Sequence, residues 1–305
     1  MYLFNKSKFL LVLLLFRFIE YLERKNIIIM RNEQFSLIGA NGKPINGDLT
    51  YDENNTNTPL VIFVHGFKGF KDWGAHHLAA RYFVKNGYRY LKFNLSHSGV
   101  TAEKPTDVSD MDTFASNTFS KELVDVDIII NHAVKYLGVD GVYLIGHSRG
   151  GGLSILQGAN NPYVKGLITW SSIADFSSLW KKEQEAEWHK SGKIGVYNAR
   201  TKETMPLDVT LLEDFEANQA ELDILDAAKR INIPWLIVHG DDDVNVPFET
   251  AEQLANANPA SRLVKIEGAN HVYGAVHPYP GETLPPQLFE VCEKSLKFLN
   301  SINVL

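Results

Sequence analysis

The chain has 305 residues, of which 45% are hydrophobic and 22% charged, proportions typical of a globular protein. Its net charge of −6 argues against nucleic-acid binding, which depends largely on lysine and arginine neutralising phosphates. The single cysteine, Cys292, excludes an internal disulfide and fits a reducing compartment, so we expect a cytoplasmic protein. Composition leaves the oligomeric state open.

The first 30 residues differ from the rest of the chain. The apolar run at 9–16, preceded by Lys6 and Lys8, resembles the start of a secretory signal, but no small-residue cleavage site follows. The run is far shorter than the roughly 20 apolar residues of a membrane-spanning helix, so we expect no stable membrane span. Three interpretations stay open: an extension upstream of a start at Met30, an amphipathic helix lying on a membrane or on the body of the protein, and an atypical signal or anchor.

Residues 31–305 predict one domain of the α/β class. Apolar runs alternate with amphipathic segments, a pattern that favours a mainly parallel central sheet with helices on both faces. The run at 59–64 is continuously apolar, as in a strand buried on both sides. The expected strands are 35–38, 47–51, 59–64, 88–93, 141–145, 164–170, 233–238 and 262–266, and the expected helices are 75–86, 119–137, 149–159, 247–255 and 286–299. Cys292 falls in the last of these helices as a packing residue.

This alternation is interrupted at about 171–226, which is polar and rich in lysine and glutamate. We expect these residues to form a cap insertion over the strand ends. Four aromatic residues are spread through it, and two roles are open for each: lining an apolar substrate pocket or forming the cap's own small core. They are Trp180, Trp188, Tyr197 and Phe215.

A candidate nucleophile follows the strand at 141–145, in the sequence Gly-His-Ser-Arg-Gly with Ser148 at its centre. A serine at a sharp strand-to-helix turn needs small neighbours, because the helix must pass close to the strand. Gly146 and Gly150 supply that space, and the hydroxyl then projects above the sheet edge. The new helix also presents backbone N–H groups to a developing oxyanion.

An oxyanion hole is expected from two backbone N–H groups, those of Phe67 and Arg149. Phe67 follows the buried strand at 59–64 through a His-Gly pair, and Arg149 directly follows the candidate nucleophile. His65 is expected to be structural, with its ring bonded to nearby backbone. The nearby Lys68 and Lys71 are expected to be solvated side chains.

A carboxylate and a histidine follow the last two predicted strands. Asp241, Asp242 and Asp243 come after the strand at 233–238, and spacing alone does not separate them. His271 follows the strand at 262–266 and is the preferred general base, with His277 as its rival. The remaining histidines are expected at the surface or in packing roles, and none shows zinc-site spacing, so we expect neither a metal nor a cofactor. The histidines assigned to surface or packing are His76, His77, His97, His132 and His189.

These blocks, in this order, resemble the α/β-hydrolase superfamily, and the resemblance covers residues 33–301. The blocks that carry the resemblance are His65-Gly66-Phe67, the glycine-rich turn at 146–151, the stretch at 239–247 and Gly268-Ala269-Asn270-His271. Within the α/β-hydrolase superfamily, the chain is most similar to bacterial esterases of the cinnamoyl/feruloyl esterase, dienelactone hydrolase and serine aminopeptidase-like groups. The resemblance implies a Ser148–Asp243–His271 triad, because the acid in those groups is the fifth residue of the His-Gly…Val-Pro block. The stretch Ser96-His97-Ser98-Gly99-Val100 departs from the usual Gly-His-Gly-x-Ser, so the resemblance implies chemistry rather than a substrate.

The expected function is hydrolysis of small-molecule carboxylic esters through an acyl-enzyme. A peptidase or amidase, and a thioesterase or acyltransferase, would use the same triad, and the sequence does not separate these activities. A serine at position 148 disfavours the dehalogenase and epoxide-hydrolase chemistries, which place aspartate there. A binding protein on a hydrolase scaffold is the remaining alternative, although all three triad residues are present.

Overall fold

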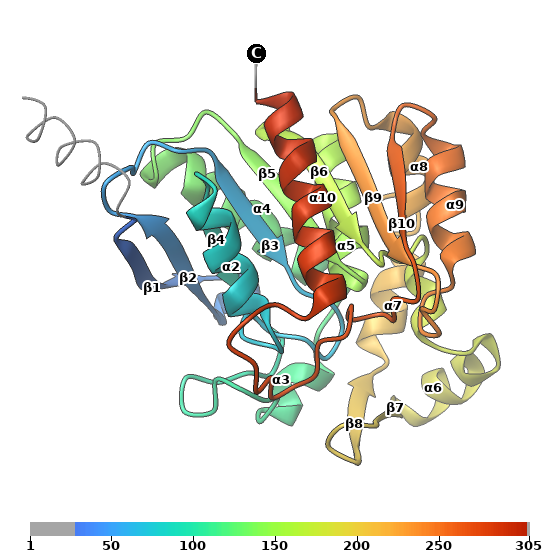
Figure 1. Cartoon of the computed structure of the whole chain (residues 1–305). Helices are drawn as coiled ribbons and strands as arrows, with labels where there is room; N and C mark the ends of the chain where they lie inside the picture. The colour runs from blue at the N-terminus through green and yellow to red at the C-terminus, as the bar shows by residue number, and fades with distance from the viewer. Residues whose placement is uncertain (1–27, 304–305) are drawn as a thin grey trace, which may run out of the picture.

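The computed structural model describes residues 28–303 and contains one eight-stranded sheet in the order β1-β2-β4-β3-β5-β6-β9-β10 (Figure 1). The first two strands form an antiparallel hairpin at one edge, β2 pairs antiparallel with β4, and the other pairings are parallel. The α/β fold expected from the sequence is therefore confirmed. The strands are β1 (Met30–Ile38), β2 (Pro44–Asp52), β3 (Leu60–Val64), β4 (Arg89–Phe93), β5 (Val142–His147), β6 (Val164–Trp170), β9 (Trp235–Gly240) and β10 (Arg262–Ile266).

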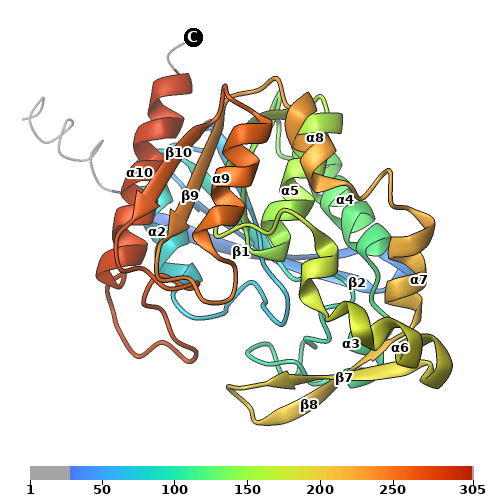
Figure 2. The same cartoon turned by 90° about the vertical axis from the view of Figure 1, so that its right-hand side faces the viewer.

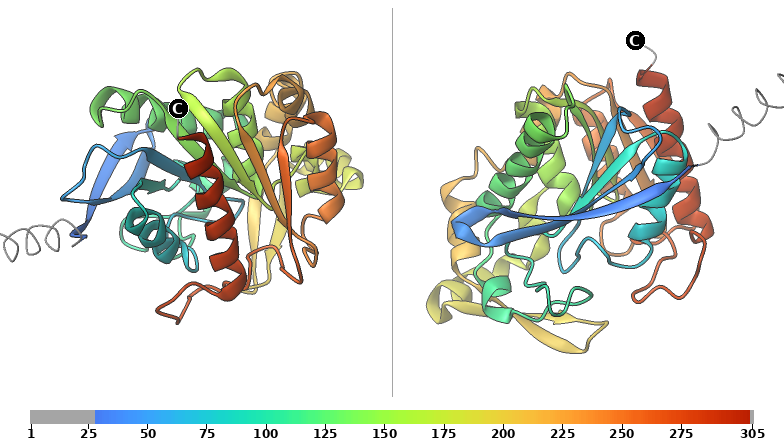
Figure 3. Two further views of the ribbon diagram at one scale, coloured as in Figure 1. Left: turned by 45° about the horizontal axis from the view of Figure 1, so that its top comes forward. Right: turned by 90° about the vertical axis from the view of Figure 1, so that its left-hand side faces the viewer.

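Helices cover both faces of the sheet (Figures 1 and 3). The central strand β3 is buried on both sides: Ile62 and Val64 face one hydrophobic core, while Val61 and Phe63 face the other. One core is closed by α2 (His76–Lys85) and α10 (Pro286–Ile302), and the other by α4 (Phe119–Tyr136), α5 (Arg149–Asn160), α8 (Ile224–Arg230) and α9 (Phe248–Ala257).

Cys292 lies in α10 and is buried, as the apolar pattern predicts. Burial raises the pKa of its thiol, so this side chain is a neutral packing group.

The segment predicted as a cap insertion, 171–226, contains an antiparallel hairpin of β7 (Lys193–Asn198) and β8 (Glu203–Asp208). Figure 2 shows this hairpin with α6 (Glu185–Ser191) and α7 (Thr210–Ala217) at the end of the molecule where α3 (Met111–Ala115) lies. Three short 3-10 helices, at Ala40–Gly42, Phe176–Leu179 and Lys182–Gln184, complete the described elements. Helix α8 starts inside the segment, at Ile224, but packs into the helical layer beside α5.

Residues 1–27, where most of the N-terminal extension falls, lie outside the described residues. The three interpretations of that extension stay open. Strand β1 begins at Met30, and the backbone of Ile29 pairs with that of Glu53 just before it. Within residues 28–303, no helix is long and apolar enough to cross a membrane.

A buried cluster of four charges joins β2, β4 and the loop after β3. Asp48 accepts hydrogen bonds from Lys71, at 2.8 Å, and from Lys92, at 2.5 Å, and both ammonium groups also bind Asp72. The expectation that Lys71 is a solvated side chain is wrong, because its side chain is 9% exposed. Burial by itself lowers the pKa of Lys71, but hydrogen bonds and the charges of both carboxylates outweigh it and raise that pKa.

Replacing Asp48 with asparagine should destabilise the protein by about 3–5 kcal/mol, because two buried ammonium groups lose the carboxylate between them. Urea unfolding of wild type and variant measures the change in free energy of unfolding. Glu293→Gln is the control, since this carboxylate pairs with Lys297 in an exposed position and should change stability by less than about 1 kcal/mol. Equal effects of the two substitutions would contradict the prediction.

Candidate active site

The predicted site residues lie where parallel strands end. His65 follows β3, Ser148 follows β5, Asp243 comes after β9 and His271 after β10. Because β3, β5, β6, β9 and β10 run parallel, their carboxyl ends meet at one edge of the sheet. Segments far apart in the sequence thus come together there.

Ser148 lies on a strained turn between β5 and α5. Its φ of 56° and ψ of −123° are outside the conformations that a residue with a side chain normally adopts. The turn requires glycine at two neighbours: a Cβ on Gly146 would lie 2.3 Å from the carbonyl oxygen of Gly150, and a Cβ on Gly150 would lie 2.3 Å from that of Val64. The Ser148 amide donates to the Trp170 carbonyl at 2.9 Å, which ties the turn to β6.

His271 and Asp243 are hydrogen-bonded, with 2.8 Å between His271 Nδ1 and Asp243 Oδ2. The other carboxylate oxygen, Oδ1, accepts the N–H groups of Asn245 and Val246, each at 2.9 Å. Burial acts to raise the pKa of Asp243, but hydrogen bonds from His239 and His271 outweigh it and hold that pKa well below its usual range. Asp243 is therefore an anion that only accepts, so His271 Nδ1 carries the proton of this hydrogen bond, and the neutral ring has its lone pair on Nε2.

The two neighbouring aspartates are directed elsewhere. Asp241 accepts the Gly268 N–H at 2.6 Å and pairs with Lys265 at 3.3 Å, which fastens the end of β10. The side chain of Asp242 is exposed. Of the three carboxylates that spacing left unresolved, only Asp243 contacts His271.

A second histidine, His147, supports His271 from the other side. Its Nε2 donates to the His271 carbonyl at 2.8 Å, and the centroids of the two rings are 4.8 Å apart. Burial lowers the pKa of His147 to about 3, so the ring stays neutral beside His271. His147 directly precedes Ser148, so its place near the site could have been predicted. The Gly-x-Ser-x-Gly motif allows any residue at that position, so the motif itself does not point to a histidine.

The two amides predicted for the oxyanion hole belong to Phe67, which lines the same cavity as Ser148, and to Arg149, the first residue of α5. Within the described part of the chain, neither the Phe67 N–H nor the Arg149 N–H donates a hydrogen bond to a protein acceptor. Phe67 is brought close by Gly66, on which a Cβ would lie 3.4 Å from Ser148 Oγ. Both amides are therefore available to a ligand at the serine.

The Arg149 side chain connects the two residues of the predicted oxyanion hole. Its guanidinium lies 4.8 Å from the ring centroid of Phe67 and pairs with the buried Glu122 at 2.5 Å. Asn117 donates to the same carboxylate at 2.8 Å. These contacts fix the loop that carries Phe67 relative to the start of α5.

Ser148 and His271 line one cavity of about 190 Å³. His76 lines it too, and its ring also packs on Phe63 with 4.5 Å between ring centroids, as the packing role expected for this histidine requires. The cap contributes Asn198 and Arg200, which no local pattern predicts because they come from a hairpin far from every motif. The other lining residues are Gly66, Phe67, Lys68, Gly69, Trp73, His147 and Val272.

Two further histidines near the site, the structural His65 and the rival base His277, are bonded to backbone. His65 lies between the Gly66 carbonyl, 2.9 Å from Nδ1, and the Leu95 N–H, 3.1 Å from Nε2, and burial lowers its pKa to about 4. This confirms its structural role. His277 accepts the Gly74 N–H at 2.9 Å and is not among the residues that line the cavity.

Three of the four aromatic residues of the cap pack together. Trp180 lies 5.6 Å from Trp188 and 5.4 Å from Phe215, measured between ring centroids, and both tryptophans are buried. Tyr197 is 59% exposed. None of the four lines the cavity at Ser148, and the core that Trp180, Trp188 and Phe215 join is not the cap's own. It is shared with α4, where Phe119 lies 6.3 Å from both Trp180 and Phe215 between ring centroids.

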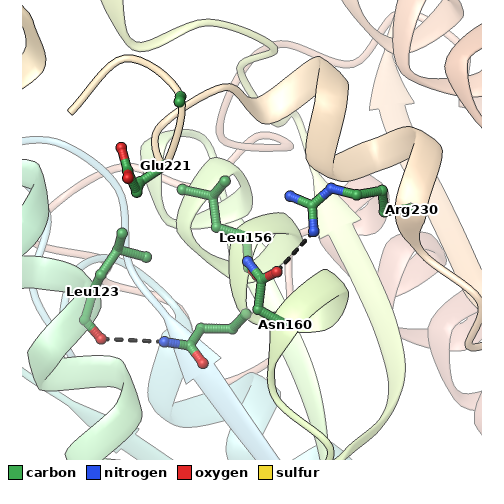
Figure 4. Close-up of a pocket in the computed structure, with 7 residues that line it drawn as sticks. Leu123, Leu156, Asn160, Glu221 and Arg230 are labelled. Carbon is green, nitrogen blue, oxygen red and sulfur yellow. Dashed lines mark hydrogen bonds between the residues drawn. The ribbon is translucent and has the colours of Figure 1, made fainter.

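A second pocket, of about 430 Å³, lies between α4, α5 and α8 and contains none of the predicted site residues (Figure 4). Three of its polar side chains, those of Gln157, Asn160 and Arg230, already bond one another or the backbone. Arg230 donates to Asn160 at 2.8 Å, and Gln157 donates to the Leu123 carbonyl at 3.2 Å. This pocket therefore offers no comparable chemistry.

Known proteins with similar sequences or structures are hydrolases and related enzymes. The chain is 25% identical over 262 residues to the bifunctional esterase/perhydrolase DCH of Acinetobacter calcoaceticus, covering 73% of this chain and 89% of that protein. It is also 25% identical to a non-heme chloroperoxidase of Streptomyces lividans, covering 75% and 89%. The structure of Est1E from Butyrivibrio proteoclasticus matches with a TM-score of 0.65 at 20% identity, covering 89% of this chain and 99% of Est1E.

Residues 61–284, well over half of the chain, match the alpha/beta hydrolase family. The matched region runs from β3 to the loop before α10 and includes Ser148, Asp243 and His271. The fold and the order of the sequence blocks agree with this assignment. The chain belongs to the alpha/beta hydrolase family and is a hydrolase.

Proposed function

We propose that the protein hydrolyses carboxylic esters through an acyl-enzyme formed on Ser148. The proposal is supported chiefly by one arrangement: Ser148, on a strained turn, shares a cavity with His271, whose Nδ1 is bonded to the buried anion Asp243. The names of the relatives favour esters over amides, since DCH is called an esterase and one structure of Est1E holds ferulic acid. The cavity is small, which favours a short acyl or alcohol group.

In the proposed first step, His271 Nε2 removes the hydroxyl proton of Ser148 while the oxygen attacks the ester carbonyl. Asp243 keeps the imidazole in the required tautomer and stabilises the imidazolium. The Phe67 and Arg149 amides bind the oxyanion, and each such donor contributes about 3–4 kcal/mol to the transition state. The imidazolium then protonates the departing alcohol. Water, deprotonated by His271, releases the acid and regenerates Ser148.

A panel of chromogenic acyl esters and aminoacyl amides, tested on purified protein, separates the proposed activity from its alternatives. We expect kcat/KM to be highest on short acyl esters. Preferential cleavage of aminoacyl amides would instead indicate a peptidase. Acyl thioesters are tested beside the panel, and preferential cleavage of these would indicate a thioesterase with the same triad. Absence of turnover on the whole panel, together with an unreactive Ser148, would indicate a binding protein on this scaffold.

Hydrolysis should continue at the same rate after treatment with EDTA. In the proposed mechanism the general base is His271 and the electrophilic groups are backbone amides, so no step needs a metal ion. The rate of ester hydrolysis before and after chelation measures this. A loss of activity that added zinc restores would contradict the proposed mechanism.

A further inference from the structure

The cavity at Ser148 has an unbalanced charge. Its charged lining residues are Lys68 and Arg200, and no carboxylate lines it. Burial lowers the pKa of His76 well below its usual value and that of His147 to about 3, so these two lining histidines are neutral. The charged side chains that line this cavity are therefore both cations.

The charge of Arg200 is balanced within the protein. Its guanidinium donates two hydrogen bonds to Asp107, at 2.5 Å and 3.2 Å, in the bidentate geometry that arginine and carboxylate favour. This pair joins the β7–β8 hairpin to the loop before α3. Arg200 is thus held beside the cavity with little net charge to offer a ligand.

Lys68 has no such partner. Its ammonium group donates to the Tyr197 carbonyl at 3.2 Å and lies 5.4 Å from the ring centroid of Phe67, and no carboxylate of residues 28–303 pairs with it. The residue is half-buried, and burial lowers the pKa of its amine. A partly desolvated cation without a counter-charge is unfavourable, and an anion in the cavity would remove that cost.

We infer that the physiological substrate is a small ester that carries a carboxylate, and that Lys68 binds this carboxylate. The inference rests on the proposed ester hydrolysis and adds a substrate class to it. Lys68 directly follows Phe67 in the predicted oxyanion loop, with φ of 56°, so the cation belongs to the segment that touches the reacting carbonyl. The cavity of about 190 Å³ suits a carboxylate better than a nucleotide or another bulky anion.

The test compares matched anionic and neutral esters. One pair puts the charge on the alcohol side, 4-acetoxybenzoate against 4-acetoxybenzamide. The other pair puts it on the acyl side, mono-4-nitrophenyl glutarate against 4-nitrophenyl pentanoate. For each pair, the ratio of kcat/KM for the anionic ester to kcat/KM for the neutral ester is measured in wild type and variants. Comparing ratios between proteins cancels differences in leaving group and any general loss of active enzyme.

Lys68→Gln should lower this ratio by roughly 10- to 100-fold for at least one pair, the size expected from a hydrogen bond to a charged group. Lys68→Arg keeps the charge and should keep most of the preference. Lys202→Gln is the matched control, because Lys202 also has a positive φ, of 60°, is exposed, and does not line the cavity. Its ratios should equal those of wild type.

Ratios unchanged within about twofold in Lys68→Gln would overturn the inference while leaving ester hydrolysis intact. Equal losses in Lys68→Arg and Lys68→Gln would overturn it as well, because the charge would then be irrelevant. If wild type hydrolyses no member of either pair, the proposed function is wrong, and the inference fails with it.

Discussion

Ser148→Ala should abolish covalent labelling by a fluorophosphonate probe and lower ester turnover by several orders of magnitude. Removing the nucleophile of such a triad costs roughly 10⁶-fold in kcat in a well-studied serine protease, where the remaining site still gives about 10³–10⁴-fold catalysis over water. Alanine has no hydroxyl to acylate and is smaller than serine, so the variant should keep its fold. Probe labelling, kcat on one chromogenic ester and thermal unfolding measure the three effects.

Ser301→Ala is the control for labelling, because this serine lies on α10 and only bonds the Phe298 carbonyl. Its labelling and turnover should match wild type. Mass spectrometry of the labelled wild-type protein should place the probe on the peptide containing Ser148. Persistent labelling of the Ser148→Ala protein would show that another residue is the nucleophile.

Much of the fold was predictable because strands and helices that form the core carry their periodicity in the sequence. The run at 59–64 is continuously apolar because β3 is covered on both faces, and it was assigned within one residue. The turn at Ser148 was equally evident, since only glycine fits at 146 and 150. In both cases the close packing around a segment restricts which residues can occupy it, so the local sequence predicts that packing.

Features that depend on tertiary contacts were not predictable. The sequence gives no sign that Lys71 is buried, because Asp48, which binds it, lies on β2, more than twenty residues away, and is brought near by the fold. The β7–β8 hairpin was missed for a similar reason: its strands, of six residues each, pack against residues far away in the sequence, among them those of α3. The hairpin contributes Arg200 to the cavity because of where it lies in the fold, and no pattern in the hairpin's own sequence predicts this position.

Asp243→Asn should keep the fold and the serine but lower kcat/KM by about 10⁴-fold, the cost of the same exchange in a well-studied serine protease. Asp243 Oδ1 accepts two backbone N–H groups, so an asparagine would keep its oxygen there and direct its NH₂ group at His271 Nδ1. That nitrogen would then have to accept, which moves the proton to Nε2 and removes the base from the serine.

The neighbouring aspartates provide the matched controls for this tautomer argument. Asp241→Asn loses an ion pair with Lys265 and weakens a hydrogen bond to Gly268, and Asp242→Asn changes an exposed side chain. Neither alters His271, so each should change kcat/KM on the same ester by less than about tenfold. Because all three substitutions exchange a carboxylate for an amide, a shared change in net charge cannot explain a difference between them. If Asp241→Asn proved the most damaging, His271 would take its orientation from another group, and the acid would have to be reassigned.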